Sequence, residues 1–208
     1  MIKTCRGEKC REKIVQDYNI IPRSHTKLLQ GQVMRSCTGD LLTDSYYSFE
    51  YVNKVNKKDT GGFLCGSYAA KHFLSLINHP GLKLFDPLTQ IGGGGSTSQS
   101  IGNTGMQTQW HPLSRELYNA INLIVVCWNK PIYGRLAKIK DWLEKVPNNE
   151  PYDDQIQFVN KVVGKDHKNR TLSFMLSDLR KQNPSLRHYS FEQVNAVLAK
   201  LNIKSNFS

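Results

Sequence analysis

Residues 46–78, YYSFEYVNKVNKKDTGGFLCGSYAAKHFLSLIN, decide the fold class, because a strand pattern gives way to a helix pattern within them. From Tyr46 to Val55, aromatic and apolar residues alternate with polar ones, and this period of two predicts a half-buried strand. The face predicted to be buried carries Tyr47, Phe49, Tyr51 and Val55, and the face predicted to be exposed carries Ser48, Glu50 and Lys54.

The second half of this stretch predicts a turn and a helix. Residues 56–62 have the Asn, Lys, Asp and Gly composition of a turn, and an apolar run begins at Phe63. Between Gly66 and Asn78 the apolar residues recur at helical spacing, and His79-Pro80-Gly81 ends the helix. A strand followed closely by a helix predicts an α+β fold.

Farther along the chain, a Gly/Ser-rich segment predicts a boundary. Residues 82–88 fit either a short edge strand or an extended connection. Residues 92–109 hold four consecutive glycines followed by small polar residues, which cannot bury enough apolar surface to offset their ordering entropy. We expect a flexible linker here, the alternative being a loop ordered only by a partner. The predicted division is an α+β unit over 1–91, the linker over 92–109 and a basic helical unit over 110–208.

Five amphipathic helices are predicted in the helical unit. The first four cover Pro112–Cys127, Arg135–Val146, Gln155–Val163 with Gly164 as its C-cap, and Thr171–Lys181. The fifth begins at Ser190, which with Gln193 has the spacing of a capping box.

The segment from Cys5 to Asp44 shows no long hydrophobic period and contains a candidate metal set. Cys5, Cys10, His25 and Cys37 offer thiolates and an imidazole, the ligands that zinc prefers, with Cys65 as a substitute for either of the last two. A structural zinc ion would supply the core that this segment lacks. The alternative is a set of ordinary thiols and a solvated histidine.

The cysteine count and the lengths of the apolar runs indicate in which cellular compartment the protein is expected. Five cysteines at irregular spacing argue against a disulfide framework and for a reducing compartment, so we expect a cytoplasmic protein. The start of the sequence has no apolar signal region, and no apolar run reaches the length of a membrane span, so no membrane partner is expected.

The net charge of +11 is the largest departure from an ordinary composition. It is spread along the chain without a block of like charges, which indicates a folded body with a positive surface. Such a surface attracts phosphate backbones through the release of counterions. Nucleic acid is therefore the first partner expected, and an acidic protein is the alternative.

The candidate phosphate contacts lie around the predicted helix ends of the C-terminal unit. They are Lys161, Lys165, Lys168, Arg170, Arg180, Lys181 and Arg187, beside His188 and Tyr189, whose rings are able to stack on bases. The alternative is a solvated basic face on generically packed helices.

A second candidate chemistry rests on Cys65, which precedes the predicted helix after Gly66. A thiol at a helix N-terminus experiences the positive end of the helix dipole, which favours the nucleophilic thiolate. The base would come from His72, His79 or His111, and His111 is the best placed because the Gly-rich segment precedes it. The alternative is a small buried cysteine at the start of a packed helix.

The function expected from the sequence is therefore binding of nucleic acid by a basic intracellular protein. The alternatives are a hydrolase or transferase that uses Cys65 and a subunit that binds an acidic protein without catalysis. The sequence contains no Walker-type phosphate loop, no HExxH motif and no Gly-x-Ser-x-Gly elbow, so the reactions of those motifs are disfavoured.

Overall fold

The computed structural model of the 208-residue chain describes residues 4–88 and 109–208. The chain forms two compact units. The sheet unit comprises Met1–Phe85 and Val125–Lys138, and the helical unit comprises Asp86–Ile124 and Ile139–Ser208. Residues 125–138, which the sequence grouped with the C-terminal helices, thus belong with the sheet, and almost all of the expected linker lies outside the described residues.

The sheet unit contains a four-stranded mixed sheet, which with the helices confirms the α+β class. Its strands are β1 (Tyr18–Lys27), β2 (Ser45–Asn53), β3 (Thr60–Cys65) and β4 (Leu84–Phe85), in the order β3-β2-β1-β4. β2 pairs antiparallel with both β1 and β3, whereas β4 pairs parallel with β1 at the edge. The predicted strand is therefore confirmed as β2, and residues 84–85 form the short edge strand.

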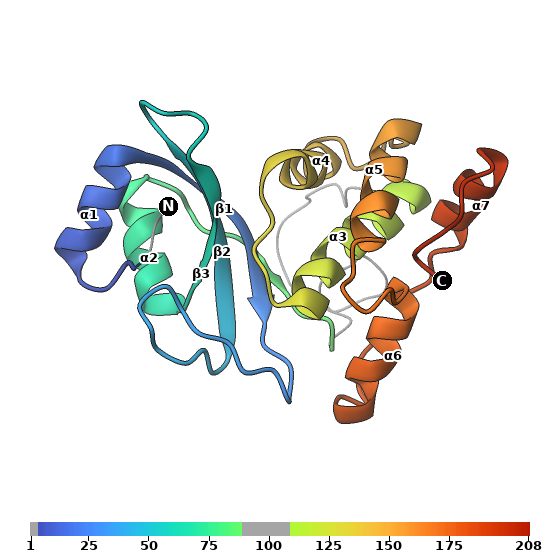
Figure 1. Ribbon diagram of the computed structural model, residues 1–208, viewed down its shortest axis with the longest axis horizontal. Coiled ribbons are helices and arrows are strands. Elements are labelled where there is room, and N and C mark those ends of the chain that lie inside the picture. The colour runs from blue at the N-terminus through green and yellow to red at the C-terminus, as the bar shows by residue number, and fades with distance from the viewer. Residues whose placement is uncertain (1–3, 89–108) are drawn as a thin grey trace, which may run out of the picture. The chain divides into compact units, whose positions relative to one another are not determined.

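Two helices, α1 (Glu8–Asp17) and α2 (Ser67–Leu76), contact each other and cover one face of the sheet (Figure 1). The predicted helix is confirmed as α2. The hydrophobic core lies between these helices and the sheet, and its largest members are Phe49, Tyr51, Phe63 and Phe73. Three of these four side chains come from β2 and β3, as the aromatic alternation of the sequence predicted.

The opposite face of the sheet is polar, but it is not exposed. Ser48 and Glu50, predicted to face solvent, are both buried, as is Tyr46 beside them. The prediction of a half-buried strand was therefore wrong for this face. The reason is that residues 125–138 cross it, on the side away from α1 and α2 (Figure 1).

A disulfide bond joins Cys5 to Cys37, with their Cα atoms 5.4 Å apart. The argument from the odd cysteine count did not anticipate it. Cys5 also donates its backbone N–H to the carbonyl of Cys37, and Cys37 donates its own to Leu64 at the end of β3. The disulfide therefore ties the segment before α1 to the chain that leads into β2 and to β3.

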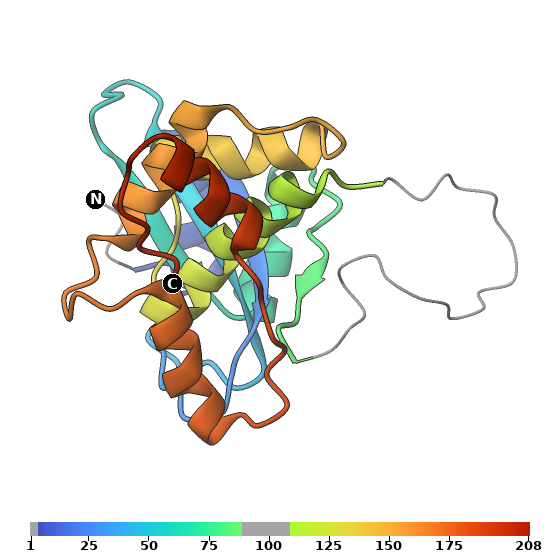
Figure 2. The ribbon, with the colours of Figure 1, turned by 90° about the vertical axis from the view of Figure 1, so that its right-hand side faces the viewer.

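The five predicted C-terminal helices are confirmed. They are α3 (Pro112–Trp128), α4 (Gly134–Lys145), α5 (Asp153–Val163), α6 (Leu172–Gln182) and α7 (Glu192–Lys200), of which α3 and α4 have residues in both units. Within the helical unit α5 and α7 lie side by side (Figure 2). None of the helices in the described residues has the length and apolarity needed to cross a bilayer.

The start of α7 differs from the predicted capping box. Phe191 occupies the cap position without a side-chain hydrogen bond, and the hydroxyl of Ser190 accepts the backbone N–H of Glu192. The N–H of Val194 instead donates to the carboxylate of Glu116 in α3, at 3.0 Å. Burial raises the pKa of this carboxyl, while the backbone N–H groups of α7 lower it. A carboxylate from a neighbouring helix has therefore replaced the local cap.

Substitution of Glu116 should loosen α7. Because Glu116→Ala removes the acceptor of a helix N-terminus, we expect the free energy of unfolding to fall by about 1–2 kcal/mol. Glu116→Gln keeps an acceptor and should retain most of that stability. Urea denaturation would measure both, with the exposed first-turn acid Glu192→Ala as the control. Equal losses for Glu116→Ala and Glu192→Ala would contradict a capping role for Glu116.

Candidate nucleic-acid interface

Most of the net positive charge of the chain lies in the sheet unit. This unit has 16 Lys and Arg against 7 Asp and Glu, a net charge of +9. The helical unit has 12 against 10, a net charge of +2. Electrostatic attraction of a polyanion follows the local excess of charge, so the sheet unit is the place to look for an interface.

The buried carboxylate of Glu50 on β2 binds Arg23 and the start of α4. Oε2 of Glu50 accepts from Nε of Arg23 at 2.7 Å and from Nη2 at 2.6 Å, and both side chains are 7% exposed. Oε1 accepts the backbone N–H of Gly134, the first residue of α4, at 3.1 Å. The carboxylate therefore neutralises a buried arginine and faces the positive end of a helix dipole at the same time.

Two further contacts fix residues 125–138, which we call the cover, on the polar face of the sheet. A Cβ atom added to Gly62 of β3 would lie 2.8 Å from Cβ of Pro131, so only glycine permits this approach. Nε2 of Gln32 donates at 2.7 Å both to the carbonyl of Val126 and to Oδ1 of Asn129. The cover is thus bound to three separate parts of the sheet unit.

The hydroxyl groups beneath the cover contribute little to this attachment. Ser24 and Ser48 lie directly opposite each other on β1 and β2, and so do Thr26 and Tyr46. In the described residues the buried hydroxyls of Ser24 and Ser48 have no hydrogen-bond partner, and those of Thr26 and Tyr46 face only each other. Burial raises the pKa of the Tyr46 phenol, which therefore stays neutral. Glu50 and Gln32 supply the polar attachments of the cover.

The outer surface of the cover is basic and partly aromatic. Residues 130–138, KPIYGRLAK, contain no acidic residue. Lys130, Arg135 and Lys138 are exposed, and Tyr133 is 51% exposed. An exposed aromatic ring between cations suits a strand of nucleic acid, because bases stack on the ring while the cations contact phosphates.

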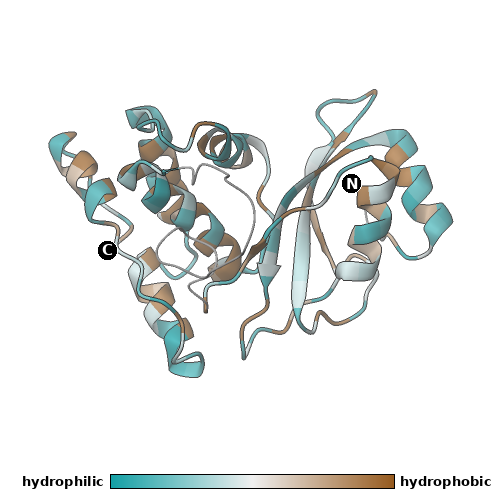
Figure 3. Ribbon diagram, turned by 180° about the vertical axis from the view of Figure 1, so that it is seen from behind, coloured by the Kyte–Doolittle hydropathy of each residue, from teal (hydrophilic) through white to brown (hydrophobic). Residues whose placement is uncertain are grey.

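A second group of cations lies close to the cover. Lys54, Lys57 and Lys58 are exposed in the turn between β2 and β3, which is mainly hydrophilic (Figure 3). Glu50 and Gly62 lie on the same two strands. Because each is four residues from the nearest of these lysines, Lys54 and Lys58, about 13 Å separates the turn from the attachment points of the cover. We call the two groups together the basic strip: Lys54, Lys57, Lys58, Lys130, Arg135 and Lys138.

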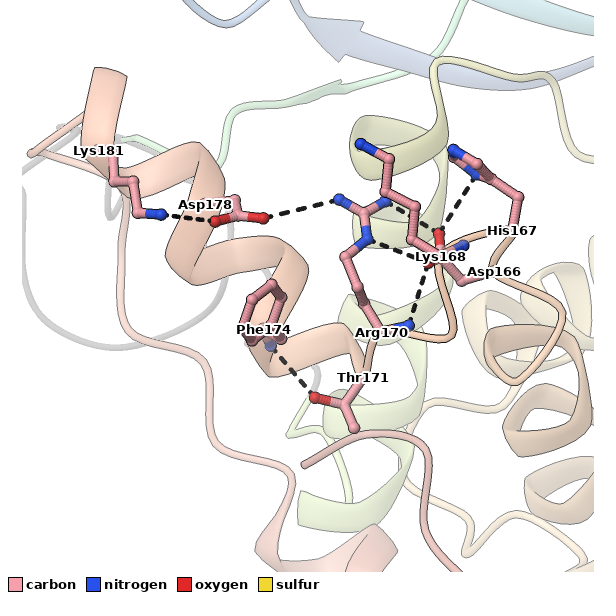
Figure 4. Close-up of polar contacts among 8 residues, drawn as sticks. All are labelled: Asp166, His167, Lys168, Arg170, Thr171, Phe174, Asp178 and Lys181. Atoms are coloured by element: carbon pink, nitrogen blue, oxygen red, sulfur yellow. Dashed lines mark hydrogen bonds and ion pairs between the residues drawn. The ribbon is translucent and has the colours of Figure 1, made fainter.

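Some of the C-terminal residues predicted to contact phosphate instead form ion pairs with carboxylates of the helical unit (Figure 4). Arg170 binds the buried carboxylate of Asp166 through Nε and Nη2, each at 3.0 Å, and also lies 3.7 Å from Asp178. The ammonium group of Lys181 lies 2.8 Å from Asp178. The bonds to Arg170 and to the backbone hold the pKa of Asp166 well below its usual range.

The remaining members of the predicted set divide into two groups. Arg180 donates to the carbonyls of Leu186 and Arg187, and the guanidinium of Arg187 lies over the ring of Tyr189, so both have structural contacts. Lys161, Lys165 and Lys168 are exposed, as is His188. These three lysines are the part of the predicted set that is able to meet a phosphate.

The candidate zinc ligands are not brought together. Cys5 and Cys37 are bonded to each other, and Sγ of Cys10 lies 3.5 Å from the carbonyl of Thr4. His25 hydrogen-bonds Ser45 and Leu82 and stacks on Tyr47, and burial lowers its pKa. Among residues 4–88 and 109–208, no three His, Cys, Asp or Glu side chains form a group suited to a metal ion.

Cys65 has the surroundings of a packed thiol. It is fully buried in the core at the end of β3, and burial raises its pKa, an effect that Arg11 only partly opposes. A raised pKa disfavours the thiolate that nucleophilic catalysis needs. His111, its expected base, belongs to the helical unit, where its backbone N–H donates to Pro147 and its buried Nδ1 has no partner in the described residues.

One family model matches the chain over residues 3–206, and its description is "Uncharacterised conserved protein UCP028583". Searches of curated proteins and of solved structures returned no match.

The Arg23–Glu50 pair can be tested by single and double substitution. Glu50→Met leaves the Arg23 guanidinium buried without its anion, and we expect a loss of about 3–5 kcal/mol in the free energy of unfolding. The double variant Arg23→Met/Glu50→Met removes both charges and should lose less than the single variant. Denaturation in urea would give the loss for each single variant, Glu50→Met and Arg23→Met, and for the double variant. A loss in the double variant equal to the sum of the two single losses would contradict a coupled pair.

Asp166 should make stability depend on pH in the acid range. Its folded pKa is depressed, so its contribution is present above the unfolded pKa of about 4 and is lost as the pH falls through the folded pKa. We therefore expect Asp166→Asn to lower the melting temperature strongly at pH 7 and less at pH 3. The exposed Glu150→Gln is the control. A deficit of Asp166→Asn that is the same at both pH values would contradict this prediction.

Proposed function

This chain belongs to the family of Uncharacterised conserved protein UCP028583, and we propose that it binds nucleic acid through the basic strip of its sheet unit. The proposal concerns recognition of the phosphate backbone. It includes no catalytic step and no bound metal.

The observation that carries the proposal is the segregation of charge between the two units, +9 against +2. In the helical unit, Arg170 and Lys181 face carboxylates and Arg180 binds backbone carbonyls. In the basic strip, Lys130, Arg135 and Lys138 lie in a segment that contains no acid, and Lys57 and Lys58 are exposed in the nearby turn, where Lys54 also donates to the carbonyl of Val15. A local excess of this kind supports sequence-independent attraction of phosphates. The affinity should fall steeply as the salt concentration rises, because the release of counterions is then less favourable.

The side chains of the basic strip suggest how the contact is made. Lysines act as flexible point charges that follow a phosphate backbone, whereas Arg135 offers a planar fork that suits a phosphate group. Tyr133 stands half-exposed among them and provides a surface for base stacking. This combination favours single-stranded nucleic acid, in which bases are free to stack on a side chain.

The alternative of an acidic protein partner uses the same cations but not the stacking surface. Removal of the Tyr133 ring separates the two cases, because a protein partner bound by charge alone should tolerate Tyr133→Ser. Single-stranded nucleic acid should bind this variant more weakly, by about 1–3 kcal/mol if a base stacks on the ring.

Two triple variants test where the interface lies. Lys57→Ala/Lys58→Ala/Lys130→Ala removes three exposed lysines of the basic strip, and Lys161→Ala/Lys165→Ala/Lys168→Ala removes three exposed lysines of the helical unit. Both lower the net charge by the same amount. Fluorescence anisotropy with a mixed-sequence single-stranded oligonucleotide, over a series of salt concentrations, would give the affinity and its salt dependence.

We expect the wild type to bind in a strongly salt-dependent manner. The basic-strip variant should lower the slope of log K against log salt by about 2, since each lost contact to a single strand accounts for about 0.7. The helical-unit variant should stay close to the wild type. Equal effects of the two variants would place the contact elsewhere, and no binding by the wild type at low salt would refute the proposal.

A further inference from the structure

Arg11 is a buried cation without an acidic partner. Its side chain lies on α1 and is 2% exposed. Nε donates to Nδ1 of His72 at 2.9 Å, and Nη1 donates to the carbonyl of Cys5 at 3.1 Å. A ring nitrogen that accepts a hydrogen bond carries no proton, so both partners are neutral. Within the described residues, no carboxylate forms an ion pair with this guanidinium.

Burial of an unpaired charge is costly, and this cost calls for an explanation. The face of Tyr68 lies 5.7 Å from the guanidinium carbon, which offsets a part of it. Arg11 also lies beside two cysteines. It donates to the backbone carbonyl of Cys5, and its charge favours the ionised form of the Cys65 thiol against the larger opposing effect of burial.

We propose that the Cys5–Cys37 disulfide is a reversible redox site for low-molecular-weight thiols, in which Arg11 stabilises the thiolate that Cys5 carries after reduction. The reduced form then supplies the anion that Arg11 lacks. Stabilisation of a released thiolate shifts a disulfide towards its dithiol form. This role is independent of nucleic-acid binding.

The two cysteines differ in burial, and this difference suggests the direction of attack. Cys5 is fully buried, whereas Cys37 is half-buried, so we expect an external thiolate to attack Cys37. The thiolate of glutathione, for example, attacks Sγ of Cys37, the Cys5–Cys37 bond breaks, and its electron pair stays on Sγ of Cys5, the residue whose carbonyl Arg11 binds.

A second glutathione thiolate completes the reduction. It attacks the glutathione sulfur of the mixed disulfide, which releases the thiolate of Cys37 and forms oxidised glutathione. Two electrons pass from two thiolates to one disulfide, and the reverse sequence, with oxidised glutathione as the oxidant, restores the bond. Both co-reactants are of the same chemical class, a small thiol and its disulfide.

The first experiment measures this equilibrium. The full-length protein is equilibrated in buffers of varied ratio of reduced to oxidised glutathione, trapped with an alkylating reagent, and analysed by mass spectrometry of the Cys5 and Cys37 peptides. We expect Arg11→Met to shift the equilibrium towards the disulfide by on the order of tenfold, the size of a hydrogen bond to a charged group. Arg11→Lys keeps the charge and should restore most of the difference.

The control for charge is Lys13→Met, which removes one exposed cation from the same helix. It should leave the equilibrium unchanged. Equal shifts for Lys13→Met and Arg11→Met, or no shift for either, would overturn the role of Arg11. A wild-type disulfide that stays intact in the most reducing buffer would overturn the whole proposal.

A second experiment uses only the unmodified sequence, so it holds even if Arg11→Met does not fold. The oxidised protein is exposed briefly to a limiting amount of reduced glutathione and quenched with acid. We expect the glutathione adduct on Cys37. An adduct found mainly on Cys5 would show that the released thiolate is not the one beside Arg11, and the proposal would fail.

Discussion

The buried carboxylate of Glu50 is the interaction on which the sheet unit depends. It bonds to Arg23 on the neighbouring strand, and its second oxygen accepts the first N–H of α4. Without this carboxylate the guanidinium of Arg23 would lose the anion that it contacts at 2.6 Å, and the N–H of Gly134 would lose its acceptor. One side chain therefore joins two strands and fixes the cover, which explains why a polar face of the sheet is buried.

The position of the cover also determines where the charge of the protein lies. Lys130, Arg135 and Lys138 follow the Gly-rich segment in the sequence, yet they are held on the sheet through Gly134 and Pro131. Because these three cations belong to the sheet unit, the helical unit has a net charge of only +2. Within the helical unit, Arg170 and Lys181 also form ion pairs with carboxylates. The sheet unit gains a basic surface with an aromatic ring in it, and this is the physical basis of the proposed interface.

Local periodicity predicted β2, α2 and the five C-terminal helices, because each buries a regular stripe of apolar side chains. It failed for α1 and β1, since Arg11 occupies a buried position of the helix and the register of β1 shifts between Pro22 and Ser24. The proposed interface was missed for a different reason. The attachment of the cover depends on a contact between residues 50 and 134, which are 84 positions apart in the sequence. The local pattern of residues in either segment does not predict a contact over that separation.

The central claim is that nucleic acid binds the basic strip, and lysine footprinting tests it most directly. The wild-type protein would be acetylated briefly with and without a saturating single-stranded oligonucleotide, and the modification of each lysine measured by mass spectrometry. The account predicts protection of Lys57, Lys58 and Lys130, with Lys161, Lys165 and Lys168 modified as in the free protein. Protection of the second group with the first unchanged would contradict it.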